Sequence, residues 1–239
     1  MADEPGATPY AMQADYAGLA PPAREVLDCW FGAPGTPGFG DERKLWFSGD
    51  VAFDAMLRER FGELIDVAND TTINATNHTT NNATNSTTND ATAAAALDHW
   101  QATPLGALAL IIVLDQFSRN CHRNTPRAFA ADQKALRAAQ RMIASGADRL
   151  LPSAHHRAFA YLPFEHDETL ASQRESLRLF KQLQTEPGGE SYYGFAVRHA
   201  EIIERFGRFP HRNAVLGRSS TAEEIAFLRK PGSSFQAPR

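Results

Sequence analysis

The sequence predicts an all-α protein built from antiparallel helix pairs. Apolar residues recur at helical spacing along most of the chain. Residues 105–114 are apolar on every side, which is typical of a helix buried within a core. No stretch of the sequence shows the strict alternation of apolar and polar residues that marks a half-buried strand.

The first two helices have recognisable ends. One is expected over residues 21–31, because Pro22 suits a first helical position and Gly32 suits the stop. Asp50 can cap the next helix. Its apolar side chains share one face: Phe53, Leu57, Phe61, Leu64 and Ala68.

Residues 69–95 differ from the rest of the chain because Asn and Thr dominate them and helical periodicity is missing. Such a segment cannot bury enough apolar surface to offset the entropy lost on ordering, so it is predicted to be a disordered insertion. Residues 1–20 are expected to form a disordered leader and residues 236–239 a tail. A single helical domain is therefore expected over residues 21–235, interrupted by the insertion.

Helices resume after the insertion. The buried helix is expected to continue to residue 120, and Asp132 can cap a further helix that ends at Gly146. Ser153 can cap the next one, which Pro163 should end or kink.

Three helices are expected in the last part of the chain. Residues 164–183 form a long amphipathic pattern, and residues 191–207 form another. Two overlapping capping boxes precede a short final helix, and they pair Ser220 with Glu223 and Thr221 with Glu224.

Polar side chains fall on helix faces that should be buried. Helical spacing places His166 and Gln173 on one stripe with Leu170, and it places His199 on the inner face of the following helix with Phe195. A buried charge without a partner costs several kcal/mol, so these groups must find one another, water or a ligand. The candidate binding residues are Asp115, Gln116, Arg119, Asn120, Glu165, His166, His199, Arg208, His211, Arg212 and Asn213.

Four segments carry a family resemblance: "LDQFSRN", "TPRAFAAD", "YLPFEHDE" and "RFGRFPHRNAVLGRSSTAEE". Together and in this order they resemble a widespread family of TPR-like helical proteins, catalogued as a domain of unknown function (family nine-two-four). The resemblance extends from about Arg24 to Phe235 and implies a TPR-like array of antiparallel helix hairpins, with no activity attached. Ser118 and Asp167 stand where the family usually has Pro and Ser.

The arginines of the candidate set, together with His211, have two interpretations. A guanidinium presents a planar fork to phosphate or carboxylate oxygens, so the group could bind a small anion. The same arginines can instead pair with Asp115, Asp132 and Glu165 in a purely structural network. The aromatic residues Trp30, Trp46, Phe47 and Trp100 are interpreted as core packing.

Composition and motifs argue against several classes of function. With 24 Lys and Arg against 28 Asp and Glu, the chain lacks the basic excess typical of nucleic-acid binding. Two distant cysteines, no signal peptide and no apolar stretch of bilayer length lead us to expect a cytoplasmic protein without a membrane partner. No HExxH motif and no phosphate-binding glycine loop occur, so neither a metal nor a cofactor is expected.

Two hypotheses of function remain. The first is a TPR-like scaffold that binds a protein or peptide partner, which the fold favours by analogy. The alternative is an enzyme or binding protein for a small phosphate- or carboxylate-bearing molecule in an Arg/His-lined pocket. In that case His166 or His211 is the candidate acid or base. The sequence leaves open whether the chain is an enzyme.

Overall fold

The computed structural model describes residues 15–69 and 97–233. Residues 70–95 of the predicted insertion, the predicted tail and most of the predicted leader lie outside the described residues. Asn69, predicted as the first residue of the insertion, is instead the buried last residue of a helix and accepts a hydrogen bond from the Ser118 hydroxyl at 3.1 Å. Residues 15–18, within the predicted leader, are helical, and Leu19 is buried in the core. The helical domain therefore begins ahead of residue 21.

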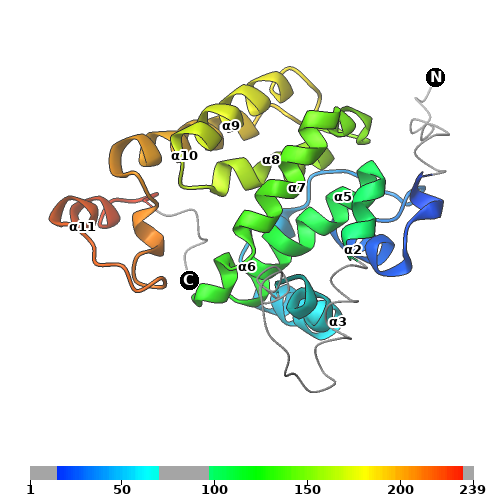
Figure 1. The fold of residues 1–239 in the computed structure, drawn as a ribbon, viewed down its shortest axis with the longest axis horizontal. Helices are drawn as coiled ribbons and strands as arrows, with labels where there is room; N and C mark the ends of the chain where they lie inside the picture. Colours follow the sequence, from blue (N-terminus) through cyan, green and yellow to red (C-terminus); the bar gives the residue numbers. More distant parts are fainter. Residues whose placement is uncertain (1–14, 70–96, 234–239) are drawn as a thin grey trace, which may run out of the picture.

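All regular secondary structure in the described part of the chain is helical, which confirms the all-α prediction (Figure 1). The α-helices are α2 (Pro21–Phe31), α3 (Val51–Asn69), α5 (Pro104–Ile111), α6 (Ser118–Cys121), α7 (Asp132–Ser145), α8 (Ala154–His166), α9 (Leu170–Leu183), α10 (Tyr192–Phe206) and α11 (Ala222–Leu228). Short 3-10 turns occur at Lys44–Trp46, His99–Ala102, Pro126–Phe129, Ala147–Leu150 and Pro210–Arg212. Within these described ranges, no helix combines the length and apolarity needed to cross a bilayer.

Helix α5 forms the centre of the core, as its uniformly apolar sequence predicts. It contacts α2, α7 and α8, and its residues Leu108 and Ile111 are fully buried (Figure 1). Its N-terminus is capped by Thr103, whose hydroxyl accepts a hydrogen bond from the Gly106 N–H at 3.1 Å. A helix that contacts neighbours on several sides must be apolar all round.

A π-helical turn, Ile112–Phe117, joins α5 to α6 without a break. Ser118 stabilises it, because both its backbone N–H and its hydroxyl donate to the Val113 carbonyl five residues earlier. Turns of this kind are rare in proteins, and those that do occur are often found at functional sites. This one contains Asp115 and Gln116, two of the candidate binding residues.

The structure corrects the prediction of one continuous helix over residues 164–183. Helix α8 continues through Pro163 to His166, and α9 begins only at Leu170, with Thr169 as its cap. The predicted stripe that joined His166 to Leu170 is therefore wrong, and Leu170 is 48% exposed.

The buried side chain of Gln173 explains why the break between α8 and α9 is stable. Its amide donates to the carbonyl of Glu165 at 2.8 Å and to that of Asp167 at 2.7 Å. It thus satisfies carbonyls at the end of α8 that have no partner within the helix.

The predicted caps are only partly correct. Asp50 accepts from the Phe53 N–H at 2.9 Å, as expected. The cap of α7 is Ala131, and Asp132 is the first residue inside the helix, so the prediction of Asp132 as the cap is wrong. Its carboxylate is used in tertiary ion pairs instead.

At α11, the capping box of Thr221 with Glu224 is confirmed. Ser220 does not form the second predicted box with Glu223. Its hydroxyl accepts a hydrogen bond from the Asn213 amide at 3.0 Å.

An aromatic cluster fixes the first elements against α8. The Trp30 ring lies 5.6 Å from that of Phe117 and 5.4 Å from that of Phe159. The Trp46 indole N–H donates to the Trp30 carbonyl at 2.8 Å, which holds the turn Lys44–Trp46 on α2. The following residue, Phe47, is consequently held beside α8.

Gly106 provides a test of the packing of α5. A Cβ atom at this position would lie 2.1 Å from the Trp100 carbonyl oxygen, so backbone would have to move. We expect Gly106→Ala to lower the free energy of unfolding by about 1–3 kcal/mol, as other overpacked sites do. Urea unfolding followed by circular dichroism measures this change.

The matched control is Gly62→Ala in α3, where a Cβ atom would meet nothing within 4 Å. Replacing an interior helical glycine there should raise the stability by about 0.5–1 kcal/mol. Effects of the same sign and size at both glycines would contradict the predicted clash.

Candidate functional site

A pocket of about 500 Å³ lies between the ends of α6 and α8, the side of α10 and the turn Pro210–Arg212. Most of the candidate binding residues line it: Gln116, Arg119, Asn120, Glu165, His166, His199, His211 and Arg212. Candidate side chains from four separate segments therefore meet at one cavity.

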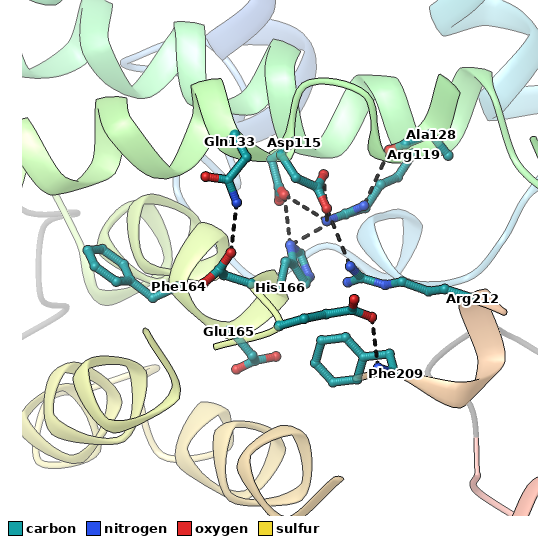
Figure 2. Close-up of polar contacts among 12 residues, drawn as sticks. Asp115, Arg119, Ala128, Gln133, Phe164, Glu165, His166, Phe209 and Arg212 are labelled. Atoms are coloured by element: carbon teal, nitrogen blue, oxygen red, sulfur yellow. Dashed lines mark hydrogen bonds and ion pairs between the residues drawn. The ribbon is translucent and has the colours of Figure 1, made fainter. Parts of the chain in front are cut away.

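Asp115 lies behind the pocket wall and is only 1% exposed. Its Oδ1 atom is 2.7 Å from Nδ1 of His166 and 3.2 Å from Nη2 of Arg119 (Figure 2). Gln116 donates to its other oxygen at 2.6 Å. The short contact with His166 makes Nδ1 the protonated nitrogen of that ring, which leaves Nε2 as its acceptor.

In this group Asp115 is ionised and His166 is neutral. Burial alone would raise the pKa of Asp115, but His166 and Arg119 outweigh it and hold the pKa below its ordinary value. Burial and the charge of Arg119 lower the pKa of His166, against the opposing effect of Asp115. A carboxylate that fixes a neutral imidazole is typical of acid–base sites.

Asp132 lies between two arginines. Nη2 of Arg119 is 3.0 Å from its carboxylate, and Nη1 of Arg212 is 3.4 Å from it. Arg119 also donates to the Ala128 carbonyl at 3.3 Å. Burial disfavours the charge of Arg119, but Asp132 and Asp115 outweigh burial and raise its pKa.

Arg212 is less well compensated than Arg119. The residue is only 6% exposed, and its buried Nε atom has no hydrogen-bond partner among the described residues. Its guanidinium lies 4.8 Å from the ring of Phe129 and 4.5 Å from that of Phe209, in cation–π contact with both. Burial first, and then repulsion by Arg119, lower the pKa of Arg212 to about 10.

Glu165 and His199 form a second carboxylate–imidazole pair in the pocket, with Nδ1 of His199 3.0 Å from Oε1 of Glu165. The same nitrogen is 2.9 Å from the Phe195 carbonyl. The rings of His199 and His166 are 6.2 Å apart. Burial and the charge of Arg212 lower the pKa of the third pocket histidine, His211, to about 3.

Two candidate residues are used outside the pocket. Arg208 binds Glu224 through two hydrogen bonds of 2.7 and 2.9 Å. Asn213 donates to Ser220 and accepts from Arg218 at 3.0 Å. These contacts fasten α11 and the loop before it, at one end of the molecule in Figure 1, so both residues have structural partners.

Sequence reasoning missed the aromatic part of the pocket. Trp46, Phe47, Phe129, Tyr192 and Phe195 all line it. Phe47 is 56% exposed and Phe195 49% exposed, so the interpretation of Phe47 as core packing is wrong. Periodicity did place Phe195 on the inner face with His199, but only His199 is buried, because the exposure of an aromatic side chain depends on which elements end beside it.

A further missed contact is Glu168, which accepts from the Phe209 N–H at 2.8 Å and pairs with Arg218. It holds the loop after α10 against the end of α8, and so places Arg212 beside Asp132. Across residues 15–69 and 97–233, no three His, Cys, Asp or Glu side chains come together as ligands for a metal ion.

The family is established by comparison. The model of the family described as "Bacterial protein of unknown function (DUF924)" matches residues 26–232. The chain belongs to this family. A solved structure of a protein of unknown function from Agrobacterium tumefaciens is similar to this DUF924 chain, with 33% sequence identity and a TM-score of 0.66. The similarity covers 87% of this chain and 96% of that one. No curated protein matches the chain.

The shared carboxylate of this DUF924 chain should matter for stability. Asp132→Asn leaves Arg119 and Arg212 without the anion between them, so we expect the free energy of unfolding to fall by about 3 kcal/mol. The control is Glu223→Gln, whose partner Arg205 is 46% exposed at its side chain, and it should cost less than about 1 kcal/mol. Similar losses in both variants would show that Asp132 has no special role.

His211 should make the folded state sensitive to acid. Its pKa lies at about 3 in the folded chain against 6.5 ordinarily, so between these values the unfolded chain binds a proton that the folded chain does not. The free energy of unfolding is therefore unaffected by this group above pH 6.5. Below that pH the group lowers it by at most about 1.4 kcal/mol per pH unit. Urea titrations from pH 7 to pH 4 should give a smaller slope for His211→Gln, and an unchanged slope would refute the assignment.

Proposed function

We propose that this DUF924 protein binds a small carboxylate- or phosphate-bearing molecule in the pocket, with Arg212 and Arg119 as its anion-binding side chains. The proposal depends on one observation. Arg212 is buried in the pocket wall with fewer charged and polar partners than a guanidinium needs.

The donors of Arg212 are incompletely used. A guanidinium carries five N–H groups, yet the side chain of Arg212 donates to the Asp132 carboxylate over a long distance of 3.4 Å, and Arg119 binds that carboxylate too. A buried cation with a lowered pKa is stabilised by any anion placed beside it. An anionic ligand would supply this compensation.

The aromatic rings around Arg212 prepare it for binding. Contacts with Phe129 and Phe209 hold the guanidinium in place before a ligand arrives. A side chain that is already ordered loses little conformational entropy on binding, which favours affinity. Neutral imidazoles nearby, such as that of His211, can donate or accept hydrogen bonds without adding a competing charge.

Of the two catalytic candidates, His166 is better supported than His211. Asp115 fixes its Nδ1–H, so that Nε2 is the nitrogen able to take a proton. This arrangement suits an enzyme as well as a binding protein, and His166 is the group best suited to move a proton if the bound molecule reacts.

The scaffold for a protein or peptide partner stays a second candidate. Helices α8, α9 and α10 pack consecutively on one another, as the helices of a TPR-like array would (Figure 1). The polar residues converge on one concave pocket, however, and such convergence is typical of small-molecule sites. For this reason we place the small-anion proposal first.

A thermal-shift screen of the full chain tests the proposal. The probes are inorganic phosphate, pyrophosphate, acetate and benzoate. A probe at a hundred times its dissociation constant should stabilise the protein by about 2.7 kcal/mol. Arg212→Gln should abolish this shift, and Arg212→Lys should weaken it because an ammonium lacks the planar fork.

Arg205→Gln is the control, since its guanidinium pairs with Glu223 and does not line the pocket. It should leave every shift unchanged. Equal shifts in the Arg205 and Arg212 variants would place the anion elsewhere, and no shift with any probe would contradict the proposed function.

A further inference from the structure

The pocket has two chemically different ends along α8. Phe159 lies seven residues before His166, which corresponds to a rise of about 10 Å along the helix. The Phe159 ring is 4.7 Å from that of Trp46 and 6.0 Å from that of Phe47. His166 contacts Asp115 and Arg119 at the opposite end. The aromatic residues of the turn at 44–47 therefore lie beside one end of this stretch of α8 and the buried charges beside the other, about 10 Å apart along the helix axis.

The aromatic end is incompletely covered by the protein. Phe47 reaches the pocket from the turn after α2, and Phe195 lines it from α10 between Tyr192 and His199; about half of each residue is exposed to solvent. Trp46 and Tyr192 line the same end, and Tyr192 donates to or accepts from His155 at 2.7 Å. Single exposed aromatics are common, but several in one concave site are typical of surfaces that an apolar group covers.

The other two arginines of the pocket lining already have partners. Arg123 forms an ion pair with Asp54. Arg198 lies 5.9 Å above the Phe195 ring and donates to the Gly232 carbonyl at 3.2 Å. An anionic group is therefore best placed at Arg212, away from the aromatic end.

Glu42 makes the aromatic end unfavourable for a second anion. This exposed carboxylate lines the pocket, and its charge adds to burial in raising the pKa of Tyr192. A ligand with a negative group at each end would place one of them beside Glu42 and the aromatic rings. Both desolvation and repulsion oppose that placement.

We propose that the ligand of this pocket is an amphipathic molecule with one anionic group, a carboxylate or phosphate at Arg212, and an extended apolar body against Phe47, Trp46, Tyr192 and Phe195. This inference rests on the proposed function and adds the class of ligand. The buried arginine binds the charged head, and the half-exposed rings bury the apolar body.

A chain-length series measures both parts of the ligand. Acetate, butyrate, hexanoate and octanoate are titrated into the full chain by calorimetry, with butyl and octyl phosphate as the phosphate arm. Each methylene that becomes buried should tighten binding about fourfold until the aromatic end is filled. Octanoate should bind more tightly than octanedioate, which carries a second carboxylate.

Variants separate the two ends. Phe195→Ser and Phe47→Ser should each reduce the gain in affinity per methylene. Arg212→Gln should weaken every member of the series by at least tenfold. The control is Leu170→Ser, a half-exposed apolar residue on α9 that does not line the pocket, and it should leave the whole series unchanged.

The outcomes distinguish this inference from the proposed function. If short and long anions bind equally well, the apolar body is wrong and the anion site stands. If octanedioate binds as tightly as octanoate, the restriction to one anionic group is wrong. If 8-aminooctanoate binds more tightly than octanoate, Glu42 recognises a cation and the ligand is a zwitterion. If no anion binds at all, both the proposed function and this inference are overturned.

Discussion

One carboxylate, that of Asp132, holds two buried guanidinium groups at the meeting point of three segments. Asp132 is the first residue of α7, where the positive end of the helix dipole favours a negative charge. Arg119 reaches it from α6 and Arg212 from the turn after α10. Because a buried charge must be compensated, the positions of these segments are fixed relative to one another, and the pocket takes its shape from that requirement.

The rest of the site depends on how two other segments end. The end of α8 is fixed by Gln173, which binds carbonyls that the helix leaves without partners, so His166 and Glu165 are presented to the cavity. The aromatic end depends on the hydrogen bond from Trp46 to the Trp30 carbonyl. The charged and the apolar parts of the pocket are thus built by different interactions.

The sequence was sufficient for features that depend on local pattern. The helical class, the fully buried α5 and the cap at Thr221 follow from periodicity and capping chemistry. Most of the polar residues that were expected to face inward also line the pocket. The break after His166 was not predictable, since it relies on Gln173 from the next helix. Likewise Asp is a residue type favoured at helix caps, and only the tertiary contacts show that the carboxylate of Asp132 lies between two arginines.

The π-helical turn between α5 and α6 has an evolutionary consequence. Deleting one residue from Ile112–Phe117 would turn the bond between the Ser118 N–H and the Val113 carbonyl into an ordinary α-helical one, so the chain after Ser118 would keep its direction. Arg119 and Asn120 would still face the cavity, whereas the side chains inside the turn would be redistributed around the axis, and Asp115 and Gln116 would not both keep their present positions. Relatives that share the fold but lack the extra residue are therefore expected to keep Arg119 in the pocket and to differ in the carboxylate behind it.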